Sequence, residues 1–159
     1  MNIRVGFGYD MHQLQKEREL WIGGIKIEHT HGLSGHSDAD VLIHAICDAL
    51  LGAANLRDIG YNYPDTDEAF HNIDSKVLLK HTNKLLHQKG YTIGNIDATV
   101  WAEQPKLNPH IPKMQETMSN ILNININCIS IKASTSEKMG FVGREEGITA
   151  YAVALIQKL

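Results

Sequence analysis

The stretch from Asp40 to Ala54 has the most regular apolar pattern in the chain and therefore constrains the fold most. Its apolar residues recur at three- and four-residue intervals, which is the spacing of one face of an α-helix. These residues are Val41, Leu42, Ala45, Ile46, Ala49, Leu50 and Ala53. Ser37 or Asp38 can cap the start of the helix. An apolar helix face has to pack against another layer, so we expect a layered fold.

Segments that resemble strands lie on both sides of this helix in the sequence. In residues 5–9 the apolar residues alternate with small ones, which is typical of a β-strand. After a polar loop over residues 13–19, residues 20–27 predict a short hairpin that turns at two glycines. Three more strands are predicted over residues 91–103, 129–133 and 148–156. The last of these is apolar on both faces, so we expect it to be a central, fully buried strand.

Two further helices complete the predicted order of elements. One begins at a cap, Asp74, and ends at Gly90, and the other follows the prolines between residues 105 and 112. Residues 123–127 are predicted to form a turn. The whole order predicts an α+β fold in one domain over residues 1–159, with a mixed sheet and helices packed on one face of it.

The composition excludes several classes of protein. The hydrophobic content of 43% is enough for a core, and the net charge of -3 leaves no basic surface for a nucleic acid. No apolar run approaches the ~20 residues that a membrane span needs, and no signal peptide is evident. Cys47 and Cys128 are too few for a disulfide framework, so we expect free thiols in a reducing cytoplasm.

Candidate metal ligands stand at the end of the N-terminal strand. Asp10 and His12 are two residues apart, so their side chains point the same way in an extended chain. One carboxylate oxygen and one imidazole nitrogen form half of a zinc site. His44 adds a third ligand from the helix and leaves the fourth position open, as in catalytic sites, while Asp48 can orient the His44 ring. The alternative is that His44 is a surface histidine paired with Asp40 and Asp48.

Two loops are candidates for binding. Residues 55–73 have no regular period and read either as a solvated connector or as a binding loop. Residues 134–137 carry hydroxyls and amides that suit phosphate oxygens, and Glu137 can hold a hard cation such as Mg²⁺ on them. On its own, this segment is also consistent with a capping box or a turn. His36 and Ser37, just before the helix, suit an anion as well.

Five groups of residues occur in a fixed order along the chain. They are Gly8-Tyr9-Asp10-Met11-His12, His36-Ser37-Asp38-Ala39-Asp40 with His44, Asp58-Ile59-Gly60, Tyr63-Pro64-Asp65-Thr66-Asp67, and Glu137-Lys138-Met139-Gly140-Phe141-Val142-Gly143-Arg144. Together they resemble the 2-C-methyl-D-erythritol 2,4-cyclodiphosphate synthase family of the non-mevalonate isoprenoid pathway. The resemblance covers essentially the whole chain, and the ordered set is much more specific than any single motif.

The resemblance implies a homotrimer with active sites between adjacent subunits. It implies one catalytic Zn²⁺ in each active site, held by Asp10, His12 and His44. It also implies Mg²⁺ or Mn²⁺ on the substrate diphosphate, with Glu137 as a ligand. The implied substrate is a cytidine diphosphate derivative, 4-diphosphocytidyl-2-C-methyl-D-erythritol 2-phosphate.

The resemblance also assigns roles to individual positions. His36 and Thr135 are expected to stabilise the transition state. Residues beside the metal are expected to contact the substrate, namely Asp10, His12, His36 and Ser37. The methylerythritol part is assigned to Asp58, Ile59, Gly60, Tyr63, Asp65 and Asp67. The cytidine is assigned to Ala102, Lys106, Leu107 and Ala133. The diphosphate is assigned to Ser134, Thr135, Ser136 and Glu137. Phe141 and Arg144 match positions near the three-fold axis and the substrate.

The chain departs from the family pattern at two positions. Glu145 stands where family members have glycine between the arginine and the following glutamate. This changes the charge expected of the axial channel and bears on any phosphate or prenyl ligand there. Tyr63 replaces a common phenylalanine before Pro64, a change expected to be harmless.

The implied reaction is an intramolecular attack of the 2-phosphate on the β-phosphorus, which closes a cyclic diphosphate and releases CMP. Both reacting groups are anionic, so the protein has to fold the substrate back on itself and neutralise charge. A metal-dependent phosphohydrolase is the rival enzyme, because the same ligands can activate water. A non-catalytic trimeric ligand-binding protein is the third alternative, and it would bind no stoichiometric zinc.

Overall fold

Five strands form one mixed sheet in the computed structural model, which describes residues 2–64, 66–70 and 72–159. In the order β4-β1-β7-β5-β6, β7 pairs antiparallel with β1 and β5, while β5 and β6 are parallel. The strands are β1 (Ile3–Lys16), β4 (His31–Leu33), β5 (Tyr91–Trp101), β6 (Ile129–Ser134) and β7 (Gly147–Lys158). The predicted hairpin is confirmed as a separate pair, β2 (Leu20–Ile22) and β3 (Ile25–Ile27).

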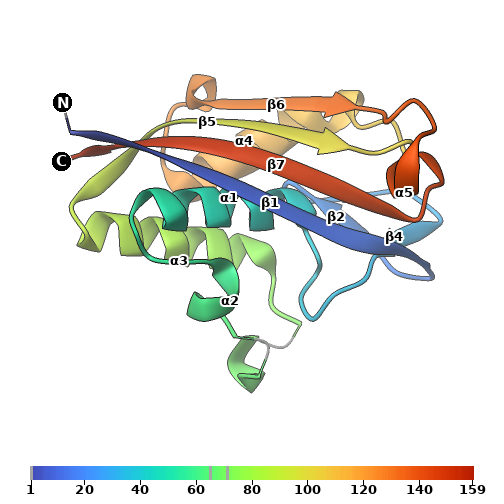
Figure 1. The fold of residues 1–159 in the computed structure, drawn as a ribbon, viewed down its shortest axis with the longest axis horizontal. Helices are drawn as coiled ribbons and strands as arrows, with labels where there is room; N and C mark the ends of the chain where they lie inside the picture. Colours follow the sequence, from blue (N-terminus) through green and yellow to red (C-terminus); the bar gives the residue numbers. More distant parts are fainter. Residues whose placement is uncertain (1, 65, 71) are drawn as a thin grey trace.

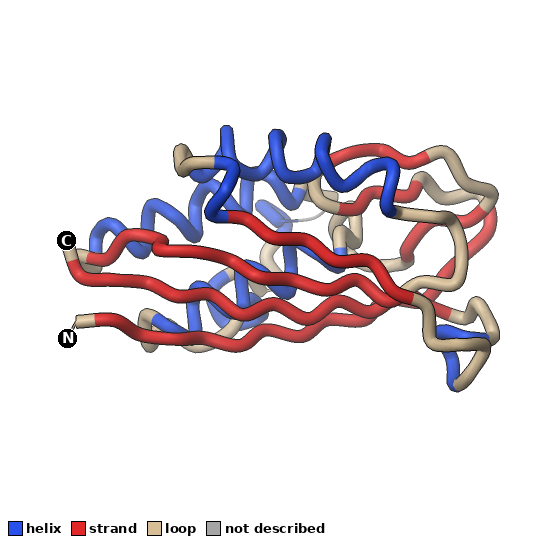
Figure 2. The backbone as a smooth tube through the Cα atoms, turned by 90° about the horizontal axis from the view of Figure 1, so that it is seen from above, coloured by secondary structure: helices blue, strands red, loops and turns tan. Residues whose placement is uncertain are grey.

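The long helices lie behind and below the strands in the view of Figure 1, and Figure 2 shows the long strands running side by side. They are α1 (Val41–Ala53), α3 (Ser75–Gln88) and α4 (Ile111–Leu122). The short helices are α2 (Ile59–Asn62), α5 (Gly140–Gly143), η1 (Glu68–Phe70), η2 (Asn108–His110) and η3 (Ile126–Cys128). This arrangement confirms the predicted mixed sheet with helices on one face.

Helix α1 packs directly against β1 and β7. The side of α1 that faces β1 carries Ala45 and Ala49, and β1 carries Gly6 and Gly8 opposite them. A β-carbon added to Gly6 would stand 1.9 Å from the carbonyl oxygen of Ala49. Only glycine allows this approach, so the N-terminal strand and the helix are matched to each other.

Asp40 caps the start of α1, in place of the predicted Ser37 or Asp38. Its carboxylate accepts a hydrogen bond from the Ile43 amide at 3.0 Å. The same carboxylate accepts from both amides of the Gly23–Gly24 turn, at 2.9 and 2.7 Å. Burial, together with the neighbouring Asp38, raises the pKa of Asp40. The buried cap therefore ties the hairpin to the helix.

Two strand predictions need correction. Strand β1 continues through residues 13–16, which were predicted as a loop, because Leu14 and Lys16 pair with Leu33 and His31 of β4. Strand β7 is central, as predicted, but it is buried on one face only. Its residue Val153 is 43% exposed, because the helices leave the other face of the sheet open.

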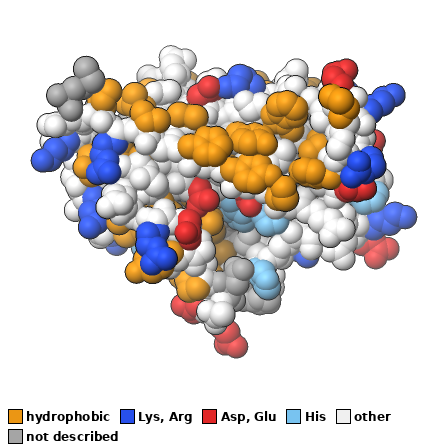
Figure 3. Space-filling view, viewed as in Figure 1, with side chains coloured by type: hydrophobic (Ala, Val, Ile, Leu, Met, Phe, Trp, Pro, Cys, Tyr) orange, Lys and Arg blue, Asp and Glu red, His pale blue; other side chains and the backbone are white. Residues whose placement is uncertain are grey.

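The open face carries a band of apolar side chains, visible as the orange strip across Figure 3. Val5 and Phe7 are each 63% exposed. The other large apolar residues of β1 and β7 that are exposed are Ile3, Tyr9, Met11, Tyr151 and Val153. A contiguous exposed apolar patch marks an interaction surface.

The segment over residues 55–73 is partly helical, because it contains α2 and η1. The turn predicted over residues 123–127 is confirmed up to residue 125, since Asn123 ends α4 in the left-handed conformation with φ 54°, and η3 begins at Ile126. In the described part of the chain, no helix combines the length and the hydropathy that a membrane span requires.

Candidate active site

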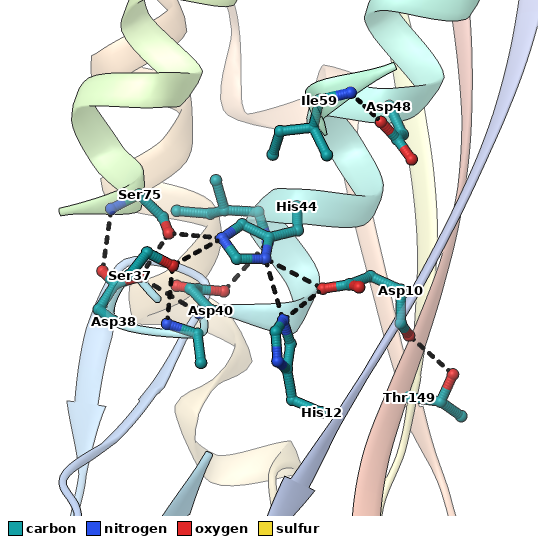
Figure 4. A network of polar contacts seen from close by, with 12 residues as sticks. Asp10, His12, Ser37, Asp38, Asp40, His44, Asp48, Ile59, Ser75 and Thr149 are labelled. Atoms are coloured by element: carbon teal, nitrogen blue, oxygen red, sulfur yellow. Dashed lines mark hydrogen bonds and ion pairs between the residues drawn. The ribbon is translucent and has the colours of Figure 1, made fainter. Parts of the chain in front are cut away.

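Asp10, His12 and His44 meet at one point between β1 and α1 (Figure 4). His12 Nε2 lies 2.9 Å from Asp10 Oδ2, and His44 Nδ1 lies 3.0 Å from the same oxygen. The two ring nitrogens are 3.2 Å apart. Among the described residues, these form the one group of three His, Cys, Asp or Glu side chains with ligand atoms this close together. The predicted convergence of the triad is confirmed.

The donor atoms of this triad fit a tetrahedral metal ion. His12 Nδ1 lies 2.7 Å from the carbonyl oxygen of Ser34, which can only accept, so Nδ1 carries the hydrogen and Nε2 faces the other two ligands. Atoms this close to one another share either a proton or a metal ion. Tetrahedral bonds of about 2.0–2.1 Å place ligand atoms about 3.3 Å apart. The observed spacing is close to that value, so the three residues suit zinc and leave one position for a substrate.

Electrostatics also favour a cation at this site. Burial opposes a charge on Asp10, but hydrogen bonds with His12 and His44 outweigh it and lower the pKa of the Asp10 carboxyl. Burial likewise opposes a charge on the His12 ring, yet Asp10 raises the pKa of His12 above its ordinary value. The carboxylate therefore keeps its negative charge inside the cavity, where it attracts either a proton or a metal.

The far side of the His44 ring is held by two serines. Its Nε2 lies 3.0 Å from Ser75 Oγ and 3.2 Å from Ser37 Oγ. Asp48, predicted to orient this ring, instead accepts a hydrogen bond from the Ile59 amide at 2.7 Å. This corrects the prediction: Asp48 holds the start of α2. No sequence signal pointed to Ser75, because its place beside His44 depends on how α3 packs.

A cavity of about 220 Å³ opens beside the triad. Five more of the predicted site residues line it, namely His36, Ser37, Ile59, Gly60 and Tyr63. Phe70, Ile73 and Leu78 add an apolar wall that the sequence did not reveal. The structure therefore brings three of the six predicted methylerythritol contacts, Ile59, Gly60 and Tyr63, to the metal ligands.

Two of the predicted acidic contacts, Asp58 and Asp67, do not line this cavity. Asp58 caps α2 by accepting from the Tyr61 amide at 2.7 Å. Asp67 lies in the loop before η1, where its amide donates to the Pro64 carbonyl. Asp65 lies outside the described residues. Their predicted substrate contacts remain predictions.

A second cavity, of about 380 Å³, lies near the β6 edge of the sheet, at the end of that strand. It is lined by the predicted residues Ala102, Lys106, Leu107, Ala133, Ser134 and Thr135, and by Pro105, Asn108 and Pro109. The strand register runs from Met11 through Thr149 and Trp101 to Ser134. Three strand spacings amount to about 14 Å. Within one chain, the two cavities are therefore separate.

The loop after β6 is held in shape by a residue that the sequence analysis missed. Glu103 accepts hydrogen bonds from the Ser136 amide at 2.8 Å, from the Ser136 hydroxyl at 3.0 Å and from the Lys138 amide at 3.2 Å. Although desolvation opposes them, these bonds lower the pKa of Glu103. Glu137 is exposed and accepts from Thr135 Oγ1 at 2.9 Å. The loop thus presents hydroxyls and a carboxylate on a fixed turn.

Phe141 and Arg144 lie on and beside α5 and line neither of these two cavities. Phe141 borders a further cavity of about 290 Å³ that also touches Met11 and His12. Arg144 forms a two-pronged ion pair with Glu146, at 2.8 and 3.1 Å. Glu145 has φ 58°, a left-handed conformation that glycine adopts more readily.

Comparison with known proteins identifies the family. The YgbB family model matches residues 3–157. The 2-C-methyl-D-erythritol 2,4-cyclodiphosphate synthase of Parabacteroides distasonis is 67% identical over 100% of this chain and 99% of its own length. The bifunctional IspDF of Campylobacter jejuni matches with a TM-score of 0.95 and 41% identity, over 99% of this chain and 42% of that one. The CDP complex of Plasmodium falciparum IspF matches with a TM-score of 0.87 and 34% identity, over 99% of this chain and 97% of that one. The chain therefore belongs to the YgbB family, the 2-C-methyl-D-erythritol 2,4-cyclodiphosphate synthases, as the motifs of its sequence predicted.

Proposed function

We propose that this protein converts 4-diphosphocytidyl-2-C-methyl-D-erythritol 2-phosphate into 2-C-methyl-D-erythritol 2,4-cyclodiphosphate and CMP. The reaction breaks the bond between the α- and β-phosphates while the 2-phosphate oxygen bonds to the β-phosphorus. The observation that carries the proposal is the triad of Asp10, His12 and His44, open to a cavity lined by the predicted substrate contacts. The full-length curated relatives carry the name of the same activity.

The metal site is proposed to hold Zn²⁺ through Asp10 Oδ2, His12 Nε2 and His44 Nδ1. Zinc bound there supplies positive charge that polarises a phosphate. Glu137 is proposed to hold Mg²⁺ or Mn²⁺ together with the substrate phosphates, because a single exposed carboxylate suits an ion whose other ligands are phosphate and water. The buried thiol of Cys47 fits a cytoplasmic protein.

The chain's own residues position the substrate. The apolar wall of Phe70, Ile73 and Leu78 offers water no hydrogen-bond partner in the metal cavity, which favours cyclisation over hydrolysis. The second cavity is proposed to hold the cytidine, with Lys106 among the residues that contact it. His36 borders the metal cavity and Thr135 borders the second one, and both are proposed to stabilise the charge of the transferring phosphate.

These contacts need more than one subunit. His36 and Thr135 line separate cavities within a chain, while the open face of the sheet carries an apolar band. A homotrimer that buries the apolar band at its centre brings the second cavity of one subunit next to the metal cavity of its neighbour. Such a contact joins two different surfaces and closes into a ring.

Phosphorus NMR of the reaction mixture tests the proposal. A cyclic diphosphate plus CMP, lost on chelation and restored by Zn²⁺ with Mg²⁺, is the expected result. His44→Ala serves as the matched control, because it removes one metal ligand without touching the open face. A linear phosphate product would identify a phosphohydrolase instead. If the zinc-loaded protein formed no product, the non-catalytic ligand-binding protein would be the remaining alternative.

A further inference from the structure

Two serine hydroxyl groups contact the His44 ring on the side away from the other metal ligands. These contacts alone do not show which ring nitrogen carries the hydrogen. His44 Nε2, which faces away from the other metal ligands, lies near Ser75 Oγ and Ser37 Oγ (Figure 4). A hydroxyl can either donate or accept, so these distances fit a proton on either ring nitrogen. The distinction matters because a metal binds only to a nitrogen with a free lone pair.

Asp38 resolves this ambiguity. The Ser75 hydroxyl forms a short hydrogen bond with Asp38 Oδ1, and the Ser75 amide donates to Asp38 Oδ2 at 2.9 Å. The Asp40 amide donates to Oδ1 as well, at 3.2 Å. Three donors thus face the two oxygens of Asp38, which act as acceptors in this arrangement. Ser75 has a single hydroxyl proton, and that proton is committed to Asp38.

The oxygen of Ser75 is therefore left as an acceptor towards His44. Nε2 of His44 has to carry the ring hydrogen, and in the neutral ring the lone pair lies on Nδ1, the atom that faces Asp10 and His12. Ser75 is fully buried at the first residue of α3. The positive end of the helix dipole favours the charged Asp38 there.

We propose that Asp38 and Ser75 are positioning residues of the metal centre. Asp38 orients the Ser75 hydroxyl, and the hydroxyl fixes the His44 ring in the form that presents Nδ1 to the metal. This inference rests on the proposed metal site and deepens it. Partners of this kind change metal affinity by about 10–100-fold.

Two variants test the chain of hydrogen bonds at different points. Ser75→Ala removes the acceptor of His44 Nε2. Asp38→Asn keeps the size of the side chain, but its amide can donate to Ser75, which frees the hydroxyl proton to point at His44 and favours the wrong ring form. We expect zinc affinity, measured by competition with a chromogenic chelator, to fall by about 10–100-fold in each.

Ser119→Ala is the matched control. Ser119 is a buried serine of α4 whose hydroxyl donates to the Glu116 carbonyl, remote from the metal centre. We expect this variant to bind zinc as tightly as the unmodified chain. Thermal unfolding and oligomeric state, measured on all variants, separate a loss of zinc affinity from a loss of folding.

The ring form itself can be read from the unmodified protein. Nitrogen NMR of the zinc-loaded protein, labelled at histidine, is expected to show the hydrogen of His44 on Nε2, the nitrogen that faces Ser75. A hydrogen on Nδ1 would overturn the inference, even if both variants failed to fold. Unchanged zinc affinity in folded Ser75→Ala and Asp38→Asn proteins would overturn it as well. If the unmodified chain bound no zinc at all, the proposed metal site itself would fail.

Discussion

Gly8 lies so close to α1 that a β-carbon there would stand 1.9 Å from the carbonyl oxygen of Ala45. Gly8 is two residues before Asp10, and Ala45 directly follows His44. The direct backbone contact between β1 and α1 therefore sets the distance between Asp10 and His12 on the strand and His44 on the helix. The spacing of the ligands is built into the packing of the core.

Gly8→Ala is expected to destabilise the protein by several kcal/mol, on the order of 3, because backbone has to move apart. It should also weaken zinc binding, since the ligands move with the backbone. Gly52→Ala is the control, because nothing lies within 4 Å of a β-carbon there and alanine favours the helix by roughly 0.5–1 kcal/mol. Chemical denaturation measures the stability of both variants. Equal stability of the two variants would contradict the packing account.

His44→Ala is expected to abolish stoichiometric zinc while the trimer persists. The ring is buried beside α3 and does not reach the open face, so subunit contacts are not disturbed. Elemental analysis gives the metal content, and light scattering gives the mass. A zinc-free His44→Ala protein with full activity would refute the metal assignment.

Glu137→Gln is expected to weaken the dependence of activity on added Mg²⁺. The amide keeps the size of the side chain but loses the charge that a hard cation needs. Activity measured against Mg²⁺ concentration should shift to higher concentrations. An unchanged titration would remove Glu137 from the proposed ion site.

Zinc affinity is expected to fall as the pH falls. Asp10 raises the pKa of His12 above its ordinary value of 6.5, so in the metal-free protein His12 already holds a proton somewhat above that pH. Zinc has to displace this proton, and affinity therefore drops through the raised pKa and continues to drop below it. Zinc titrations across this range measure the effect. A flat profile would show that His12 is not a ligand.

Tyr63→Phe is expected to cost about 1 kcal/mol of stability. The Tyr63 hydroxyl is buried, with Thr82 Oγ1 at 2.9 Å and His81 Nδ1 at 3.1 Å. Tyr61→Phe is the matched control, because Tyr61 is 59% exposed. Thermal unfolding compares the two. If both variants unfolded alike, the Tyr63 hydroxyl would contribute nothing measurable.

Much of the fold follows from local pattern. The apolar stripe of α1 predicted the helix, and the alternation at residues 5–9 predicted the strand that carries Asp10 and His12. The exposure of one face of β7 could not be predicted from the sequence, because apolar residues that face a partner look the same in a sequence as residues that face a core. The extension of β1 was missed because its polar residues pair with the short edge strand β4.

The site residues, too, were predictable only where their pattern is local in the sequence. The ligands Asp10, His12 and His44 were found because their spacing shows on one strand and one helix. Ser75, Asp38 and Glu103 were not assigned these contacts, because each bonds a group more than 30 residues away in sequence. Asp48 was misassigned because helical spacing puts it near His44, whereas the fold brings the Ile59 amide within its reach.

In the proposed trimer, the metal cavity of one subunit works with the second cavity of its neighbour. Coexpression of two inactive chains tests it most directly, one with His44→Ala and the other with Lys106→Glu, which opposes the anionic ligand. If the contacts close in a ring, about one third of the sites in a mixed trimer, and about one quarter of the sites over a random mixture of all trimers, would pair an intact metal cavity with an intact second cavity. Recovery of activity near these fractions is the predicted result. No recovery, in preparations shown to contain both chains in one trimer, would mean that neighbouring subunits do not share an active site.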